Sequence, residues 1–132
     1  MNTKKLLVAV TALTLLSGRA LVGVPAQDQD EDKTKAENWI AQADSTKALV
    51  EGVLASAIEA GAAEHPVASG QATDARHWLD EGATALATAK EALAAEDYER
   101  AANAGNMAWQ YYVKAGTSAV LAAKLVSGGG RR

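Results

Sequence analysis

Four side chains near the middle of the chain can bind a metal ion or move a proton. They follow one another at intervals of three, three and one, which places them on neighbouring parts of one helical face, and they are Asp74, His77, Asp80 and Glu81. An imidazole beside two or three carboxylates is a ligand set that divalent metals accept. The alternative is a solvated helix face on which His77 pairs with Glu81. The sequence therefore predicts a weak metal site at these four residues and leaves this alternative open.

Other chemistry has little support in the residue types. The chain has no Cys, which excludes a disulfide framework, a thiolate zinc site and a cysteine nucleophile. Asp28, Asp30 and Asp32 have the spacing of the first ligands of an EF-hand loop, but Lys33 and Trp39 stand where that loop needs Gly and Glu. No nucleophile is next to a base, and no Gly-rich turn follows a strand. We therefore expect a protein that is not an enzyme and has no cofactor.

Three helices are expected to position these residues. Apolar residues recur at the intervals of an amphipathic helix over residues 32 to about 61, 73 to about 95, and 97 to about 126. Pro66 cannot continue a helix, so residues 62–72 are expected to form a loop, and Thr73 and Asp97 are the expected N-caps of the helices that follow. No stretch alternates with period two. The predicted fold is all-α, an up-down-up three-helix bundle with long alanine-rich helices.

The core of this bundle must be thin. From Gln27 onward Leu, Ile and Val together number 15, whereas Ala supplies 27 of the 106 residues. Each Ala buries little surface, and at about 25 cal/mol per Å² the margin of stability is narrow. Trp39, Trp78 and Trp109 occur once per expected helix and are interpreted as core packing. Oligomerisation or docking onto a partner would add the missing buried area.

The third helix is apolar around much of its circumference. Trp109 and Tyr112 can point inward, but other large apolar residues then fall on a different face. Aromatic residues and Met are enriched at the centres of protein interfaces. The sequence therefore predicts that a protein partner, a second copy or the membrane covers this helix. The predicted interface residues are Met107, Trp109, Tyr111, Tyr112, Leu121 and Leu125.

Charge is segregated along the chain. All 16 acidic residues lie between Asp28 and Glu99, where five basic residues leave a net charge of −11, whereas the chain from Arg100 onward has five basic residues and no acid. Either the basic helix neutralises the two acidic ones inside the bundle, or it binds an acidic partner or anionic lipid. Nucleic acid is not an expected partner, because an acidic chain without a basic groove cannot neutralise phosphates.

Residues 1–26 have the layout of a bacterial export signal. Lys4 and Lys5 precede an uncharged apolar run over residues 6–16, and Val24-Pro25-Ala26 offers small residues at the positions that a signal peptidase reads. The alternative is a retained membrane anchor, in which Arg19 would have to snorkel. We expect an exported protein of the periplasm or the membrane-associated cell envelope. The expected parts are an export signal or anchor at 1–26, an acidic linker at 27–35, the three-helix bundle at 36–126 and a flexible tail at 127–132.

Two stretches resemble known families. Residues 15–18, Leu-Leu-Ser-Gly, followed by Ala20 resemble the lipobox of bacterial lipoproteins, with Arg19 in place of the Cys that carries the lipid. This resemblance implies an envelope lipoprotein ancestry, and Arg19 excludes lipidation. Trp78-Leu79, Gly82 and residues 94–101 are similar to the helical hairpin of tetratricopeptide repeats and of small envelope lipoproteins, although the repeat's aromatic position and further copies are missing. The lipoprotein resemblance implies a non-enzymatic periplasmic module.

Two functional hypotheses follow. The first is a non-enzymatic, exported cell-envelope module that acts as an accessory subunit or scaffold through its third helix. The alternative is a periplasmic protein that weakly binds a metal ion or a small ligand near His77.

Overall fold

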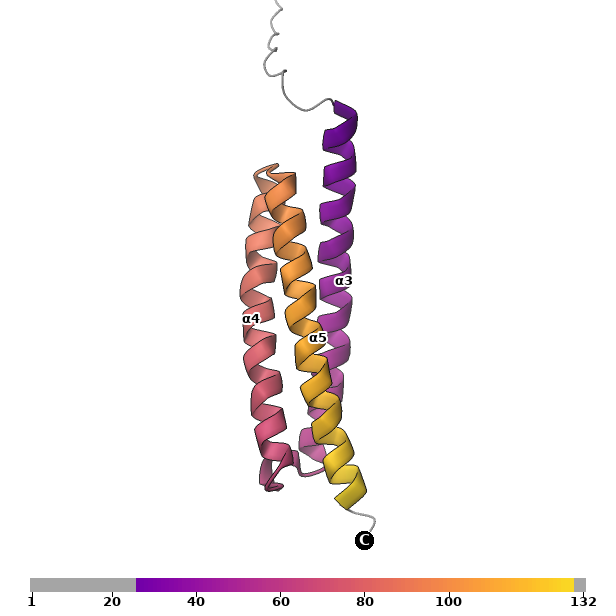
Figure 1. The fold of residues 1–132 in the computed structure, drawn as a ribbon, viewed down its shortest axis with the longest axis vertical. Coiled ribbons are helices and arrows are strands. Elements are labelled where there is room, and N and C mark those ends of the chain that lie inside the picture. Colours follow the sequence, from indigo (N-terminus) through magenta and orange to yellow (C-terminus); the bar gives the residue numbers. More distant parts are fainter. Residues whose placement is uncertain (1–25, 130–132) are drawn as a thin grey trace, which may run out of the picture. The chain divides into compact units, whose positions relative to one another are not determined.

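The computed structural model describes residues 26–129, and every regular element in this range is helical. Helix α3 spans Ala26–Glu59, α4 spans Ala68–Ala94, α5 spans Tyr98–Gly129, and a short 3-10 helix, η1, spans Ala62–Glu64. The chain divides into two compact units, residues 1–32 and 33–132, and the packing described below is that of the second unit. There α3 and α5 run in one direction and α4 in the other (Figure 1). The predicted all-α three-helix bundle is confirmed.

Two helix ends lie further out than predicted. Helix α3 begins at Ala26, so residues 27–35, predicted as an acidic linker, are helical. Carboxylates near a helix N-terminus interact favourably with the helix dipole, and Asp30 and Glu31 provide them. Helix α5 continues to Gly129 instead of ending near residue 126. The predicted export signal or anchor lies outside the described residues apart from Ala26, as do residues 130–132 of the predicted tail.

The connection between α3 and α4 is shorter than the loop predicted for residues 62–72. Gly61, with φ 101°, takes the left-handed conformation after α3, and α4 begins at Ala68 instead of near Thr73. The cause is the side chain of His65, whose Nδ1 accepts hydrogen bonds from the backbone N–H groups of Val67 at 3.1 Å and Ala68 at 3.0 Å. An imidazole thus takes the capping role that usually belongs to Ser, Thr, Asp or Asn.

Helices α4 and α5 are joined by a tight turn of three residues, Ala95 to Asp97. The backbone N–H of Asp97 donates to the carbonyl of Ala92 at 2.9 Å and that of Glu96 donates to the carbonyl of Leu93 at 3.0 Å, which together form a Schellman motif. The motif places Glu96 at φ 62°. The carboxylate of Asp97 accepts a hydrogen bond from the backbone N–H of Arg100 at 3.3 Å, so the predicted N-cap of the third helix is confirmed.

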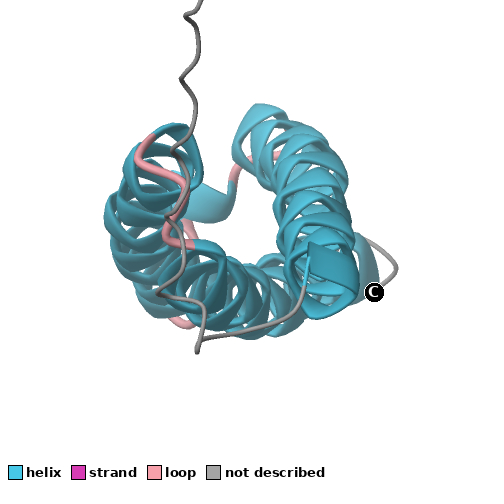
Figure 2. Ribbon diagram, turned by 90° about the horizontal axis from the view of Figure 1, so that it is seen from above, coloured by secondary structure: helices cyan, strands magenta, loops and turns pink. Residues whose placement is uncertain are grey.

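The core is alanine-rich, as predicted. Of the 21 buried hydrophobic residues among those described, 16 are Ala. The central layer takes residues from all three helices: Ile40 and Ala43 from α3, Leu86 and Ala89 from α4, and Ala104, Ala108 and Tyr112 from α5. Figure 2 shows the helices from above, arranged around this common centre. The apolar residues that recur at helical intervals in the three helices therefore meet in the interior.

Candidate interaction surface

Tyr112 does not belong to the surface where the sequence analysis placed it. It is the largest fully buried side chain, and its ring lies against Gly82 of α4. A Cβ atom at Gly82 would lie 2.5 Å from Cε1 of Tyr112, closer than real Cβ contacts come. Only glycine therefore fits opposite this ring, and Tyr112 serves the core instead of an interface.

The hydroxyl of Tyr112 has no hydrogen-bond partner in the described part of the chain. Burial, followed by the negative charges of Asp44 and Glu51, raises the pKa of Tyr112 from 10 to about 12. The phenol therefore stays protonated at neutral pH. A neutral, fully enclosed hydroxyl cannot reach a substrate, so the most perturbed titratable group described is a structural one.

A stripe along α5 is turned away from this core. Its positions follow one another at intervals of four and three, which keeps them on one helical face. We call it the aromatic stripe, and it consists of Met107, Tyr111, Lys114, Ser118, Leu121 and Leu125. The side chain of Met107 is 49% exposed and that of Leu121 is 42% exposed. Four of the six predicted interface residues, Met107, Tyr111, Leu121 and Leu125, thus share one helical face. Leu125, at the end of this face, is however half-buried and packs against a core cluster of four alanines.

In the middle of the aromatic stripe, Tyr111 packs against Trp78 of α4. The rings of Trp78 and Tyr111 stack with centroids 5.7 Å apart and planes 14° apart. The ammonium of Lys114 lies 4.4 Å from the ring centroid of Trp78 and 5.8 Å from that of Tyr111, a cation–π arrangement. Trp78 packs against the core cluster that contains Ala75 and Ala115, as its interpretation as core packing predicts, and because it is only half-buried its ring also contributes to the surface. Its position depends on the register of α4 against α5, which no pattern within one helix reveals.

A shallow hollow of about 320 Å³ adjoins Tyr111 between α4 and α5. It is lined by Glu81, Thr84, Ala85, Thr88, Ala104, Met107 and Tyr111. This volume is at the lower end of the range for ligand sites, roughly 300 to 1,000 Å³. The lining residues carry three hydroxyls and one carboxylate and are otherwise apolar, and the size of the hollow suits a single side chain.

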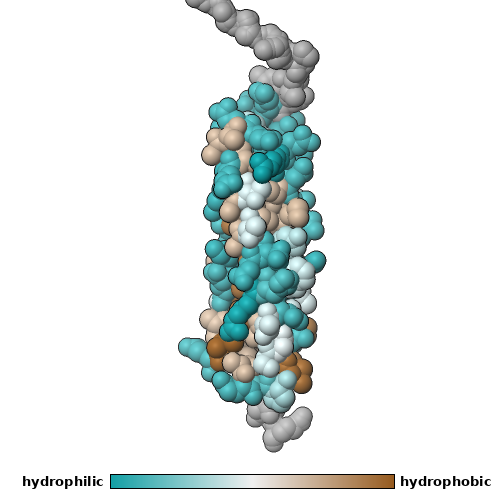
Figure 3. Space-filling model, turned by 90° about the vertical axis from the view of Figure 1, so that its left-hand side faces the viewer, coloured by the Kyte–Doolittle hydropathy of each residue, from teal (hydrophilic) through white to brown (hydrophobic). Residues whose placement is uncertain are grey.

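The predicted metal ligands are placed differently. Asp74, His77, Asp80 and Glu81 are all exposed on α4. Figure 3 shows that hydrophilic side chains cover much of the left-hand side of the molecule as drawn in Figure 1, where α4 lies. No group of three or more His, Asp or Glu side chains within the described residues is arranged to hold a metal ion. The ring of His77 instead packs edge-on against Trp78, with centroids 4.7 Å apart.

Trp109, the remaining predicted interface residue, bridges α5 and α3. Its ring lies 5.5 Å from that of Trp39 at an angle of 50°, and it is half-buried. Gly105 makes this approach possible, since a Cβ atom there would lie 2.9 Å from Cβ of Trp39. Trp109 and Trp39 thus pack the helices together, as the core-packing interpretation predicts.

The cations of α5 make no ion pair with the acidic helices in the described part of the chain. The one ion pair there joins Lys90 of α4 to Asp44 of α3 at 3.4 Å. Both side chains are about half exposed, so the pair contributes little to stability, typically about 0 to 1 kcal/mol. The alternative in which the acidic helices neutralise α5 therefore finds no direct contact to support it.

Comparison with known protein families, curated proteins and solved structures finds no match for this chain. Within residues 26–129, no helix has both the length and the hydropathy that crossing a membrane requires.

Proposed function

We propose that the protein is a non-enzymatic, exported cell-envelope module that docks as an accessory subunit or scaffold through the aromatic stripe of α5. The observation that carries this proposal is the exposure of Met107 and Leu121 on either side of the Trp78–Tyr111 stack. Exposed apolar side chains that gather around aromatic rings are typical of interface centres. The export signal predicted for residues 1–26 supports the proposed location.

The stripe is also suited to binding in its charge and its rigidity. Lys114 is its only charged residue, and the ammonium of that residue already rests on the ring of Trp78. Stacked rings lose little side-chain freedom when a partner covers them, because they are ordered beforehand. The expected partner presents an apolar surface with a carboxylate placed to meet Lys114. The alanine-rich core buries little apolar surface, so binding of a partner to the folded bundle would add stability that the core alone does not supply.

The test is crosslinking in cells that produce the full chain. A photo-crosslinking amino acid is placed at Leu121 on the stripe or, as the matched control, at Ala87, which is exposed on α4. The expected result is a discrete adduct of fixed added mass from Leu121 and none from Ala87, with the adduct reduced by Tyr111→Ala. The absence of an adduct at Leu121, or the same adducts from Ala87, would contradict the proposal.

A further inference from the structure

A second stripe of α5 lies beside the aromatic stripe, on the flank towards α3. Its positions again follow intervals of four and three. We call it the valine stripe, and it consists of Glu99, Asn103, Asn106, Gln110, Val113, Thr117, Val120 and Lys124. All are exposed except the half-buried Asn106, and Val113 and Val120 are each 42% exposed. The stripe carries one acid at its first position, one base at its last, and no charge between them.

The neighbouring flank of α3 has the same character. Its exposed positions are uncharged over five turns, and they are Asn38, Gln42, Ser45, Leu49, Gly52 and Ser56. We call this the α3 stripe. Leu49 is the most exposed large hydrophobic residue among those described, at 70%. Asp44 lies on another flank of α3, where it meets Lys90 of α4, whereas the same intervals continued beyond the α3 stripe reach Lys35 at one end and Glu59 at the other. The surface that α3 and α5 share is therefore uncharged in its middle and charged only towards its ends.

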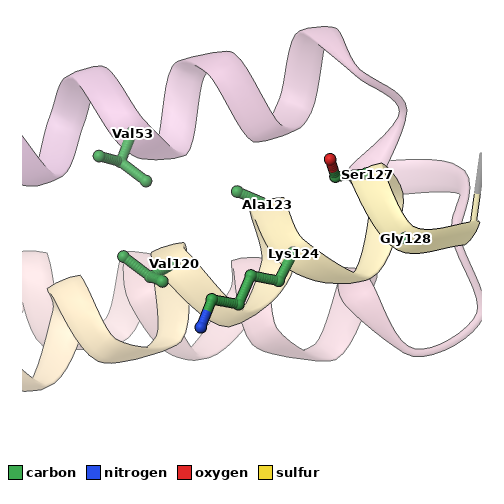
Figure 4. A pocket seen from close by; sticks show the side chains of 6 residues that line it. All are labelled: Val53, Val120, Ala123, Lys124, Ser127 and Gly128. Atoms are coloured by element: carbon green, nitrogen blue, oxygen red, sulfur yellow. The ribbon is translucent and has the colours of Figure 1, made fainter.

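The two stripes border one continuous surface. A hollow of about 320 Å³ lies between the helices and is lined by Val53, Val120, Ala123, Lys124, Ser127 and Gly128. Figure 4 shows Val53 of α3 across from Val120 and Ala123 of α5, with the Lys124 side chain running back along α5. Further along the helices, a Cβ atom at Gly116 would lie 3.2 Å from a methyl group of Val50, so the two backbones stay close.

This surface is just large enough for a specific contact. From Asn106 to Lys124 the helix rises about 27 Å, and two helices side by side are roughly 20 Å wide. The face therefore measures about 540 Å², and two such faces bury about 1,100 Å² together, slightly above the roughly 1,000 Å² expected of a specific interface. Depletion of charge in the centre with charge at the ends is also the pattern of a protein interface.

We propose that this face docks onto the same face of a second copy, with the two α5 helices antiparallel across a twofold axis. The positions of the two charges carry the inference. An antiparallel pair centred between Gln110 and Val113 places Glu99 of each copy opposite Lys124 of the other, whereas a parallel pair places like charges together. The pairing rests on the proposed role of α5 as a binding helix, but it is centred on a different flank of α5 from Met107 and Tyr111.

The same register also determines which residues of the two copies face each other between the charged ends. Val120 of one copy meets Asn103 of the other, and Thr117 meets Asn106, where a hydroxyl and an amide can form a hydrogen bond across the interface. The α3 stripe then faces its own copy and is uncharged from Asn38 to Ser56. Because several of these positions are polar, the dimer is expected to be weak, with a dissociation constant in the micromolar range.

Sedimentation equilibrium of the full chain in mild detergent tests the proposal. The unmodified chain should show a reversible monomer–dimer equilibrium. Glu99→Lys and Lys124→Glu should each weaken the dimer about tenfold, because each change replaces two attractions by two repulsions, and the double variant should regain most of the affinity. Glu91→Lys is the matched control: it makes the same charge change on the exposed face of α4 and should leave the dimer unchanged. Helical circular dichroism verifies the fold of each variant.

Three outcomes would overturn the inference. They are a chain that stays monomeric at all concentrations, a double variant that remains as weak as the single ones, and a dimer lost on Leu121→Glu but indifferent to the charge changes. None of them decides the proposed function, which depends on crosslinking at Leu121. Conversely, a dimer with the expected charge dependence and no adduct at Leu121 would support self-docking and contradict the accessory role.

Discussion

Tyr111 and Tyr112 are neighbours in the chain, yet α5 gives them opposite surroundings. Tyr112 points into the core, lies against Gly82 and leaves its hydroxyl without a partner. Tyr111 points outward, stacks on Trp78 and lies under the ammonium of Lys114. One position along a helix thus separates a residue needed for the fold from a residue available for binding. Changes on the inner side should alter stability, and changes on the outer side should alter docking.

Alkaline pH should have the largest effect on the inner side. Below pH 10 both the folded and the unfolded chain keep the phenol proton of Tyr112. Between pH 10 and about pH 12 the unfolded chain releases it and the folded protein does not, so roughly 2 to 3 kcal/mol of stability is lost as the pH rises. Urea unfolding at pH 9 to 12 measures this loss. Tyr112→Phe is the control, and an equal loss in that variant would refute the assignment.

Gly82→Ala should have the next largest effect, a net loss of up to about 2 kcal/mol. The new methyl group must displace the fully buried ring of Tyr112, an overpacking cost of typically 1 to 3 kcal/mol that outweighs the gain of about 1 kcal/mol in helix propensity. Gly52→Ala is the matched control, because nothing lies within 4 Å of a Cβ atom there and only the propensity gain remains. Thermal unfolding of both variants gives the comparison. If both changes stabilise the protein alike, the ring does not occupy this position.

Tyr112→Phe should raise stability at neutral pH by about 1 kcal/mol, because a buried hydroxyl without a partner costs more than the atom contributes in packing. The same substitution at Tyr111 should change stability little, since that ring is half-buried and its hydroxyl is not enclosed. Chemical denaturation of the two variants side by side measures the difference. A clear loss in Tyr112→Phe would mean that its hydroxyl has a favourable interaction in the folded protein.

Lys114→Gln should have the smallest effect on stability. A cation over an exposed aromatic ring contributes about 0.5 to 1 kcal/mol, and the stack of Trp78 on Tyr111 persists without it. The yield of the crosslinked adduct at Leu121 should fall more than the stability does, because the substitution removes the only charge of the aromatic stripe. Unfolding and crosslinking at Leu121 are measured on the same variant. If stability and crosslinking fell by the same proportion, Lys114 would not act mainly in docking, and the proposed difference between the two sides of α5 would be contradicted.

Periodicity predicted the inner side of the bundle well. Leu79, Gly82, Leu86, Ala89 and Leu93 of α4, at heptad intervals, are all buried or half-buried. The cap at Asp97 also follows from a local rule, because a carboxylate three residues before an N–H needs no tertiary information. Tyr112 fits the same inward pattern, and its sequence position already allowed it to point inward, so its prediction as an interface residue was wrong.

The features that sequence patterns missed depend on contacts between segments or on unusual local chemistry. The cap at His65 replaces an oxygen by an imidazole nitrogen, so the rule that favoured Thr73 placed the start of α4 too late. The stack of Trp78 on Tyr111 requires the register of one helix against another. The neutral valine stripe becomes meaningful only when α3 is known to present a neutral stripe beside it.

The tight turn at Glu96 and Asp97 also bears on the order in which the protein folds. Only three residues separate α4 from α5, so closing this hairpin costs little chain entropy, and the Schellman motif and the Asp97 cap both form without help from α3. Contacts that are local in sequence form fastest. We therefore expect the α4–α5 hairpin to be the nucleus and α3 to dock afterwards. Pulse-labelled hydrogen exchange would then protect amides of α4 and α5 before those of α3.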